Sequence, residues 1–146
     1  METGLNTFIL EKSGISPRDI RSYSPLVLAY IGDGIYDLVI RSMIVGKGNS
    51  NVNSLHRQTS QIVKAHTQSE MIGVLQQDLT EEEITIYKRG RNANSPTTAK
   101  NATIMDYRRA TGFEALMGYL YLEDRMDRIM ELILIGLDKI GKGVQG

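Results

Sequence analysis

The segment from Pro25 to Val45 limits the possible folds most, because it is apolar on almost every side of a helix. Its apolar side chains are Leu26, Val27, Leu28, Tyr30, Ile31, Ile35, Tyr36, Leu38, Val39, Ile40, Met43 and Ile44. A helix that is apolar all round lies inside a protein rather than at its surface. Ser24-Pro25 marks its start and Gly46 its end. We therefore expect a central helix with neighbours on several sides.

Helical spacing also dominates the rest of the chain. Further helices are predicted over residues 5–12, after Ser16-Pro17, and over 51–65, 69–77, 80–91, 102–122 and 125–140. Thr80 and Glu83 form a capping-box signature, and Asp124 is the expected cap of the last helix. No alternating β-branched run is long enough for a strand. The prediction is an all-α helical bundle, one domain over 1–146 with its core at about 17–140.

Asp33 is out of place in the apolar segment, because Gly32 and Gly34 flank it in mid-helix. Each glycine there costs about 1 kcal/mol relative to alanine, and an unpaired buried carboxylate costs several kcal/mol. Glycines let another backbone or a ligand approach closely. Asp37 has an expected ion-pair partner in Arg41, one turn further on, whereas Asp33 has none. A functional role for Asp33 would explain these costs.

Glu114 repeats this anomaly in the predicted helix over 102–122, with Gly112 and Gly118 nearby. If the two apolar helices pack side by side, Asp33 and Glu114 converge. Two hard oxygen ligands completed by water suit Mg²⁺. The alternative is that one or both acids are structural, as helix caps or as partners of a neighbouring basic residue such as Arg108 or Arg109.

A basic block interrupts a chain whose formal net charge is zero. Residues 84–110 contain six basic side chains and one acidic side chain, Asp106. Such a block fits a phosphate backbone, although a solvated helix face gives the same pattern. Few aromatic residues accompany it, which favours a duplex over single strands. The candidate contacts to such a phosphate backbone are Lys88, Arg89, Arg91, Asn92 and Lys100.

Composition excludes several other chemistries. The chain has no Cys, which removes disulfide scaffolds, thiolate zinc sites and cysteine nucleophiles. Two His residues leave little room for a histidine metal site or a Ser-His-Asp triad. The longest apolar run, 26–31, is far shorter than the ~18 residues of a membrane span, and no signal-peptide pattern is present. We expect a cytoplasmic protein without membrane contacts.

Three stretches resemble the ribonuclease III family. Residues 30–38 (YIGDGIYDL) resemble the signature around its metal-binding Asp, and residues 113–122 (FEALMGYLYL) resemble the signature that carries its metal-binding Glu. Residues 87–93, with Pro96, 99–102 and 107–108, are similar to the mini-ribonuclease III subfamily, which lacks a separate domain for double-stranded RNA. The resemblance extends from about Pro17 to about Leu137.

The resemblance implies an Mg²⁺-dependent endoribonuclease with the helical ribonuclease III fold, acting as a homodimer. It implies cleavage of double-stranded RNA to 5′-phosphate and 3′-hydroxyl ends, with precursor 23S ribosomal RNA as substrate and a ribosomal protein as possible accessory partner. Asp33 and Glu114 would be the catalytic residues and the metal ligands. In this mechanism the metal activates water and stabilises the leaving oxygen. The apolar helix over 26–40 is the expected dimer interface.

Two positions depart from the family pattern. Ala29 stands where standard ribonuclease III has a Glu, and Thr111 where it has an Asp. The number of metal ions is therefore open, and Asp37 or Asp106 are candidates for contact through water. A chain gripping RNA without a second domain relies on the basic block. His56, Arg57 and Lys64 form a weaker set, and His56 and His66 are otherwise expected to be ordinary surface histidines.

Two other functions fit parts of the sequence. A non-catalytic RNA-binding or ribosome-assembly protein would use the same basic block with inactive acids. A helical metallophosphohydrolase for small molecules is the second, although the His-Asp pairs typical of that class are absent from this sequence.

Overall fold

The computed structural model describes residues 4–93 and 103–143, which contain seven α-helices and no strand. The helices are α1 (Leu5–Ser13), α2 (Pro25–Gly46), α3 (Val52–Val63), α4 (Ala65–Leu75), α5 (Glu81–Asn92), α6 (Ile104–Leu122) and α7 (Met126–Lys139), with short 3₁₀ turns η1 (Ile20–Ser22) and η2 (Gln76–Asp78). The predicted all-α fold is confirmed. No helix in this part of the chain has the length and apolar character needed to cross a membrane.

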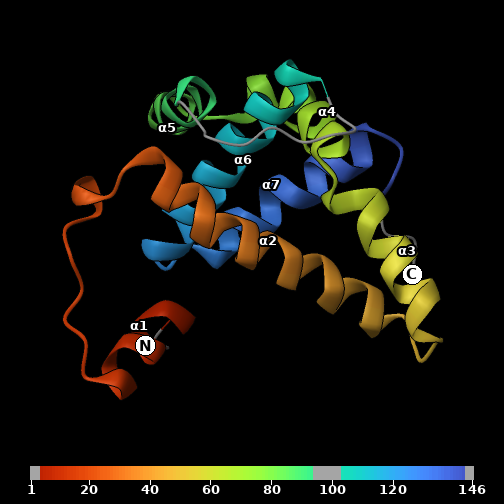
Figure 1. Ribbon diagram of the computed structural model, residues 1–146, viewed down its shortest axis with the longest axis horizontal. Coiled ribbons are helices and arrows are strands. Elements are labelled where there is room, and N and C mark those ends of the chain that lie inside the picture. Colours follow the sequence, from red (N-terminus) through yellow and green to blue (C-terminus); the bar gives the residue numbers. More distant parts are fainter. Residues whose placement is uncertain (1–3, 94–102, 144–146) are drawn as a thin grey trace.

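Helix α6 lies at the centre of the fold, in contact with α2, α4, α5 and α7 (Figure 1). Its side chains Phe113, Leu116 and Leu120 are completely buried. The ring of Tyr36 from α2 meets Phe113 edge to face, with centroids 5.3 Å apart, a favourable aromatic geometry. The predicted central helix, α2, therefore shares the core with α6, the helix that carries Glu114.

Helices α2 and α6 cross with their backbones in direct contact. A Cβ atom at Gly32 would lie 1.7 Å from the backbone oxygen of Glu114, and one at Gly118 would lie 1.9 Å from the backbone oxygen of Leu28. Only glycine fits at either position, because a carbon cannot approach a carbonyl oxygen so closely. By contrast, a Cβ at Gly34 would meet nothing within 4 Å. The crossing thus packs the backbone at Gly32, next to Asp33, against the backbone of Glu114.

Helix α5 is attached to the core near both of its ends. Near its C-terminal end, a Cβ at Gly90 would lie 2.7 Å from the Cβ of Ala115 on α6. Near its N-terminal end, Arg128 of α7 donates two hydrogen bonds of 2.8 Å to the carboxylate of Glu83, which is only 2% exposed. A buried, bidentate pair of this kind is strongly destabilising to break, by about 3–5 kcal/mol. Helix α5 is therefore held firmly against α6 and α7.

Most predicted helix boundaries agree closely with the structure, and so do the caps. The Thr80–Glu83 capping box is present, with hydrogen bonds in both directions. Ser24 accepts a hydrogen bond from the backbone N–H of Val27 at the start of α2. Helix α4 begins at Ala65, four residues before the predicted start. Most of the segment between the helices predicted over 80–91 and 102–122 lies outside the described residues.

Two predicted helix starts are wrong. No helix begins at Ser16-Pro17, because Asp19 instead accepts hydrogen bonds from the backbone and the guanidinium of Arg21 and caps the η1 turn. Asp124 does not cap α7. It adopts a left-handed conformation with φ of 56°, and its carboxylate accepts a hydrogen bond from the hydroxyl of Thr7 on α1. Asp19 is engaged by the nearby Arg21 and Asp124 by the distant Thr7, and these contacts take the place of the predicted helix starts.

Candidate active site

The two unexpected acids meet where α2 crosses α6. Asp33 is exposed on α2, and Glu114 is half-buried on α6. Burial raises the pKa of Glu114 to about 8, the hydrogen bond from Gln68 opposes this rise, and the negative charge of Asp33 adds to it. The polar side chain of Asp33 thus favours the protonated form of Glu114. The crossing at Gly32 therefore brings Asp33 close enough for its negative charge to act on the Glu114 carboxyl group.

A third polar side chain, Gln68 on α4, completes this group. Its Nε2 atom donates a hydrogen bond of 3.0 Å to Oε2 of Glu114 and one of 2.8 Å to the backbone oxygen of Val63. Gln68 is only 2% exposed. It is absent from the predicted site, because the helix predicted from Ser69 leaves Gln68 outside any element. The sequence signal that could have identified it is its helical spacing from the apolar Met71, Ile72 and Leu75, which places a polar side chain on the face that packs into the core.

The other candidate acids are engaged elsewhere. Asp37 accepts a hydrogen bond of 2.6 Å from Nε of Arg41, which confirms the expected ion pair. Asp106 lies 3.0 Å from Nδ1 of His66, and hydrogen bonds from His66 and Ser69 lower the pKa of Asp106. His66 is thus a surface histidine that links α4 to α6.

Ala29 and Thr111, the two positions that depart from the family pattern, offer no carboxylate ligand to a metal ion. Ala29 is buried, and the hydroxyl of Thr111 donates a hydrogen bond of 3.0 Å to the backbone oxygen of Tyr107 one turn earlier. Over residues 4–93 and 103–143, no three His, Cys, Asp or Glu side chains are grouped to hold a metal ion. A cation at the crossing would therefore have Asp33 and Glu114 as its charged ligands.

The basic face of α5 lies beside the start of α2. Lys88, Arg89 and Asn92 are exposed and line an open groove of about 620 Å³, together with Pro25, Thr85 and Ala93. Arg91 instead covers the ring of its neighbour Tyr87, 5.6 Å from the centroid, and donates a hydrogen bond to Oδ1 of Asn92. Lys100, the remaining predicted contact, lies outside the described residues.

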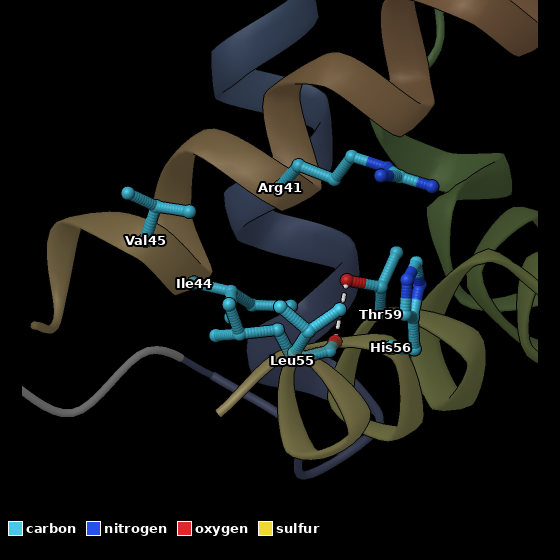
Figure 2. A pocket seen from close by; sticks show the side chains of 7 residues that line it. Arg41, Ile44, Val45, Leu55, His56 and Thr59 are labelled. Carbon is cyan, nitrogen blue, oxygen red and sulfur yellow. Dashed lines mark hydrogen bonds between the residues drawn. The ribbon is translucent and has the colours of Figure 1, made fainter. Parts of the chain in front are cut away.

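The weaker set of candidate RNA contacts belongs to α3 and its end. His56 lines a pocket of about 130 Å³ between α2 and α3, and Figure 2 shows it on the same side of this pocket as Arg41. The remaining lining residues are Ile44, Val45, Val52, Leu55 and Thr59. Arg41 lies about two helical turns beyond Asp33, so this pocket is separate from the carboxyl pair.

Residues 26–125 match the family described as the Ribonuclease III domain. This span contains both carboxyl groups, Gln68 and the basic face of α5. The chain belongs to the ribonuclease III family and is an endoribonuclease, as its signatures indicated.

Within that family the similarity is to mini-ribonuclease III. The Mini-ribonuclease 3 of Clostridium tetani is 51% identical over 121 residues, which are 80% of this chain and 80% of that protein. The Mini-ribonuclease 3 of Thermoanaerobacter sp. is 45% identical over 135 residues, 92% of each chain. A crystal structure of a Fusobacterium nucleatum protein, 36% identical, matches with a TM-score of 0.76 over 83% of this chain and 98% of that one.

Proposed function

We propose that this endoribonuclease cleaves double-stranded RNA with Mg²⁺ held between Asp33 and Glu114, leaving 5′-phosphate and 3′-hydroxyl ends. The crossing of α2 and α6, which packs Gly32 beside Asp33 against the backbone of Glu114 and lets the charge of Asp33 act on the Glu114 carboxyl, is the observation that carries the proposal. Within the described part of the chain, neither acid forms an ion pair with Lys or Arg. Two neighbouring carboxyl groups without a basic partner form a site that a cation would stabilise.

The residues at the crossing fit a hard divalent cation. Mg²⁺ is usually bound through one or two protein carboxylates, with water and substrate phosphate completing its octahedral shell. The ribonuclease III family is generally metal-dependent, and Gln68 adds a neutral amide to the two acids. A cation bound there supplies a water of lowered pKa and charge stabilisation for the leaving oxygen. Asp33, which is exposed, leaves the site open to substrate on the α2 side.

The chain's own residues divide the remaining work. Asp33 and Glu114 hold the cation from two helices whose backbones touch, so their separation is set by the crossing at Gly32. Lys88 and Arg89 on α5 hold the phosphate backbone without reading bases. Recognition of an A-form duplex by shape and phosphate contacts suits this face, since it offers few aromatic side chains for stacking on unpaired bases.

Cleavage of both strands of a duplex requires two active centres, and we propose a homodimer for that reason. Along α2 the side chains of Val27, Tyr30 and Leu38 are exposed, Tyr30 by 82%. Leu38 also lines an apolar groove of about 380 Å³ with Leu5, Met126 and Met130. The apolar outer face of α2 supports the predicted interface.

Precursor 23S ribosomal RNA in the cytoplasm, with a ribosomal protein as accessory partner, is the proposed cellular setting.

Digestion of a long, perfectly paired RNA tests the proposed function. With Mg²⁺ the duplex should be cut to short fragments that carry 5′-phosphates and 3′-hydroxyls, as shown by end labelling and ligation. A chelator should stop the reaction. Fragments with 3′-phosphates, or a duplex that stays intact with Mg²⁺ present, would contradict the proposal. Single-stranded RNA of the same sequence serves as the substrate control.

Metal binding should depend steeply on pH. Since burial raises the pKa of Glu114 to about 8, protons compete with the cation below that pH. The apparent affinity for Mn²⁺ should rise about tenfold per pH unit between pH 6 and 8 and level off above. Because folding raises the pKa of Glu114 from 4.5 to about 8, the metal-free protein should also lose stability as the pH rises between these values and level off above pH 8. Calorimetric titration across this range measures the affinity, and a profile already flat at pH 6 would count against the assignment.

The exposed bases on α5 should control RNA affinity rather than chemistry. Replacing both Lys88 and Arg89 by Ala should reduce the salt dependence of duplex binding, by a slope of about 1 for each lost phosphate contact. Affinity at physiological salt should fall about tenfold, as measured by filter binding with Ca²⁺ in place of Mg²⁺. Lys47 and Lys142, replaced together by Ala, form the charge-matched control and should leave the slope unchanged. Equal slopes for both double variants would remove α5 from the RNA interface.

A further inference from the structure

Gln68 occupies an unusual position for a neutral polar side chain. It lies on α4, whose packing partner α6 carries Glu114, and it is almost completely buried. Its Nε2 atom spans two acceptors on different elements, Oε2 of Glu114 and the backbone oxygen of Val63 at the end of α3. A side chain so placed loses considerable conformational entropy on folding, which buried apolar residues of the same size would offset better.

The chemistry of its contacts fixes the orientation of the Gln68 amide. Both neighbours of Nε2 are acceptors, a carboxyl oxygen and a carbonyl oxygen. Turning the amide over would place Oε1 against them and lose both hydrogen bonds. The NH₂ group is therefore committed to Glu114 and Val63, and the amide holds the Glu114 carboxyl in one orientation.

The other end of the same amide has no partner within the described residues. Oε1 of Gln68 is buried and accepts no hydrogen bond, the one such side-chain atom there. A buried polar atom without a partner costs about 1–3 kcal/mol, so native proteins rarely keep one unless water or an ion satisfies it. This oxygen belongs to the residue that contacts Glu114, which places the unsatisfied acceptor beside the carboxyl pair.

We propose that Gln68 is a positioning residue of the metal site, which orients Glu114 through Nε2 and accepts a hydrogen bond at Oε1 from water that enters with the cation. The inference rests on the proposed function, because it assumes that Asp33 and Glu114 hold a metal ion. Groups that orient metal ligands from behind contribute about 10- to 100-fold to metal affinity or activity.

The test is direct binding of Mn²⁺ to Gln68→Met, with free Mn²⁺ measured by electron paramagnetic resonance. Methionine keeps the length and the burial but has no amide. The dissociation constant should rise about 10- to 100-fold, and the Mg²⁺ concentration at half-maximal cleavage should rise in parallel. Saturating Mg²⁺ should restore most of kcat, because the carboxyl ligands themselves are intact.

Thr67→Val is the matched control for a purely structural role. Thr67 precedes Gln68 on α4, is fully buried, and donates a hydrogen bond of 2.6 Å to the backbone oxygen of Gln61 on α3. Both variants therefore lose one buried tie between α4 and α3, but only Gln68→Met loses a contact with Glu114. The control should bind Mn²⁺ within about twofold of the parent protein, since it leaves the metal's surroundings unchanged.

The outcomes separate this inference from the proposed function. A parent protein that binds Mn²⁺ while Gln68→Met binds it equally well would overturn the inference alone, as would equal losses in both variants. A parent that neither binds Mn²⁺ nor cleaves duplex RNA would overturn the proposed function together with the inference. If Gln68→Met does not fold by circular dichroism, Gln68→Asn, whose amide is one carbon too short to reach both acceptors, carries the same expectation.

Discussion

Asp33→Asn should abolish RNA cleavage while the fold and the duplex binding persist. The substitution keeps the size of the side chain but removes one of the two charges proposed to hold the cation. Metal-ion catalysis contributes several kcal/mol to transition-state stabilisation, and each 1.36 kcal/mol is a factor of ten. We therefore expect kcat to fall about 1,000-fold or more. Single-turnover cleavage of a labelled duplex measures the loss, and binding with Ca²⁺ measures what remains.

Glu114→Gln should cause a loss of the same size, and the double variant should lose little more, because two ligands of one ion act as a unit. Asp37→Asn is the matched control, since Asp37 lies one turn further along α2 and pairs with Arg41. The control should retain cleavage within about threefold, as expected for an exposed ion pair. Cleavage by Asp33→Asn at a tenth of the parent rate or faster would refute the assignment of the site.

Gly32→Ala should destabilise the protein severely, whereas Gly34→Ala should stabilise it. The new methyl at position 32 would lie 1.7 Å from the backbone oxygen of Glu114, so α2 and α6 must separate. Overpacking of a core commonly costs about 1–3 kcal/mol, and here the obstacle is backbone that cannot rotate away, so we expect about 3 kcal/mol or more. At position 34 the methyl meets nothing, and Ala should gain about 1 kcal/mol from its higher helix propensity.

Urea unfolding of the two variants measures this contrast, and each serves as the control for the other because both flank Asp33. Loss of metal affinity should accompany Gly32→Ala even where the variant remains folded, since the carboxyl groups move apart with their helices. Stability changes of the same sign in both variants would show that the crossing does not depend on Gly32.

Patterns that arise within one helix predict the fold well. The bounds of α2 and α6, the Thr80 capping box and the Asp37–Arg41 pair all follow from spacing over a few residues, which the sequence displays directly. The meeting of Asp33 with Glu114 can be predicted as well from two acids in apolar, glycine-flanked helices, but the cost of burial falls on Glu114, because Asp33 is exposed. Of the two glycines beside Asp33, however, only Gly32 contacts another backbone.

Features that depend on contacts between distant segments escape prediction from the sequence. Gln68 gains its meaning from Glu114, forty-six positions away, and Asp124 gives up its expected cap to bind Thr7. The buried Glu83–Arg128 pair joins α5 to α7 in the same way. No local spacing indicates such partners, since their proximity exists only after the helices have packed.

If α5 holds the RNA backbone as proposed, its attachment to the core would set where an RNA strand can be cut. One side of this helix carries Lys88 and Arg89, while Gly90 on the other side rests on Ala115, directly beside Glu114 in the chain. A phosphate gripped by α5 and a phosphate placed at the acids would thus be separated by a constant span of duplex. The enzyme would then act as a ruler, with fragment ends spaced by the dimensions of the protein rather than by base identity.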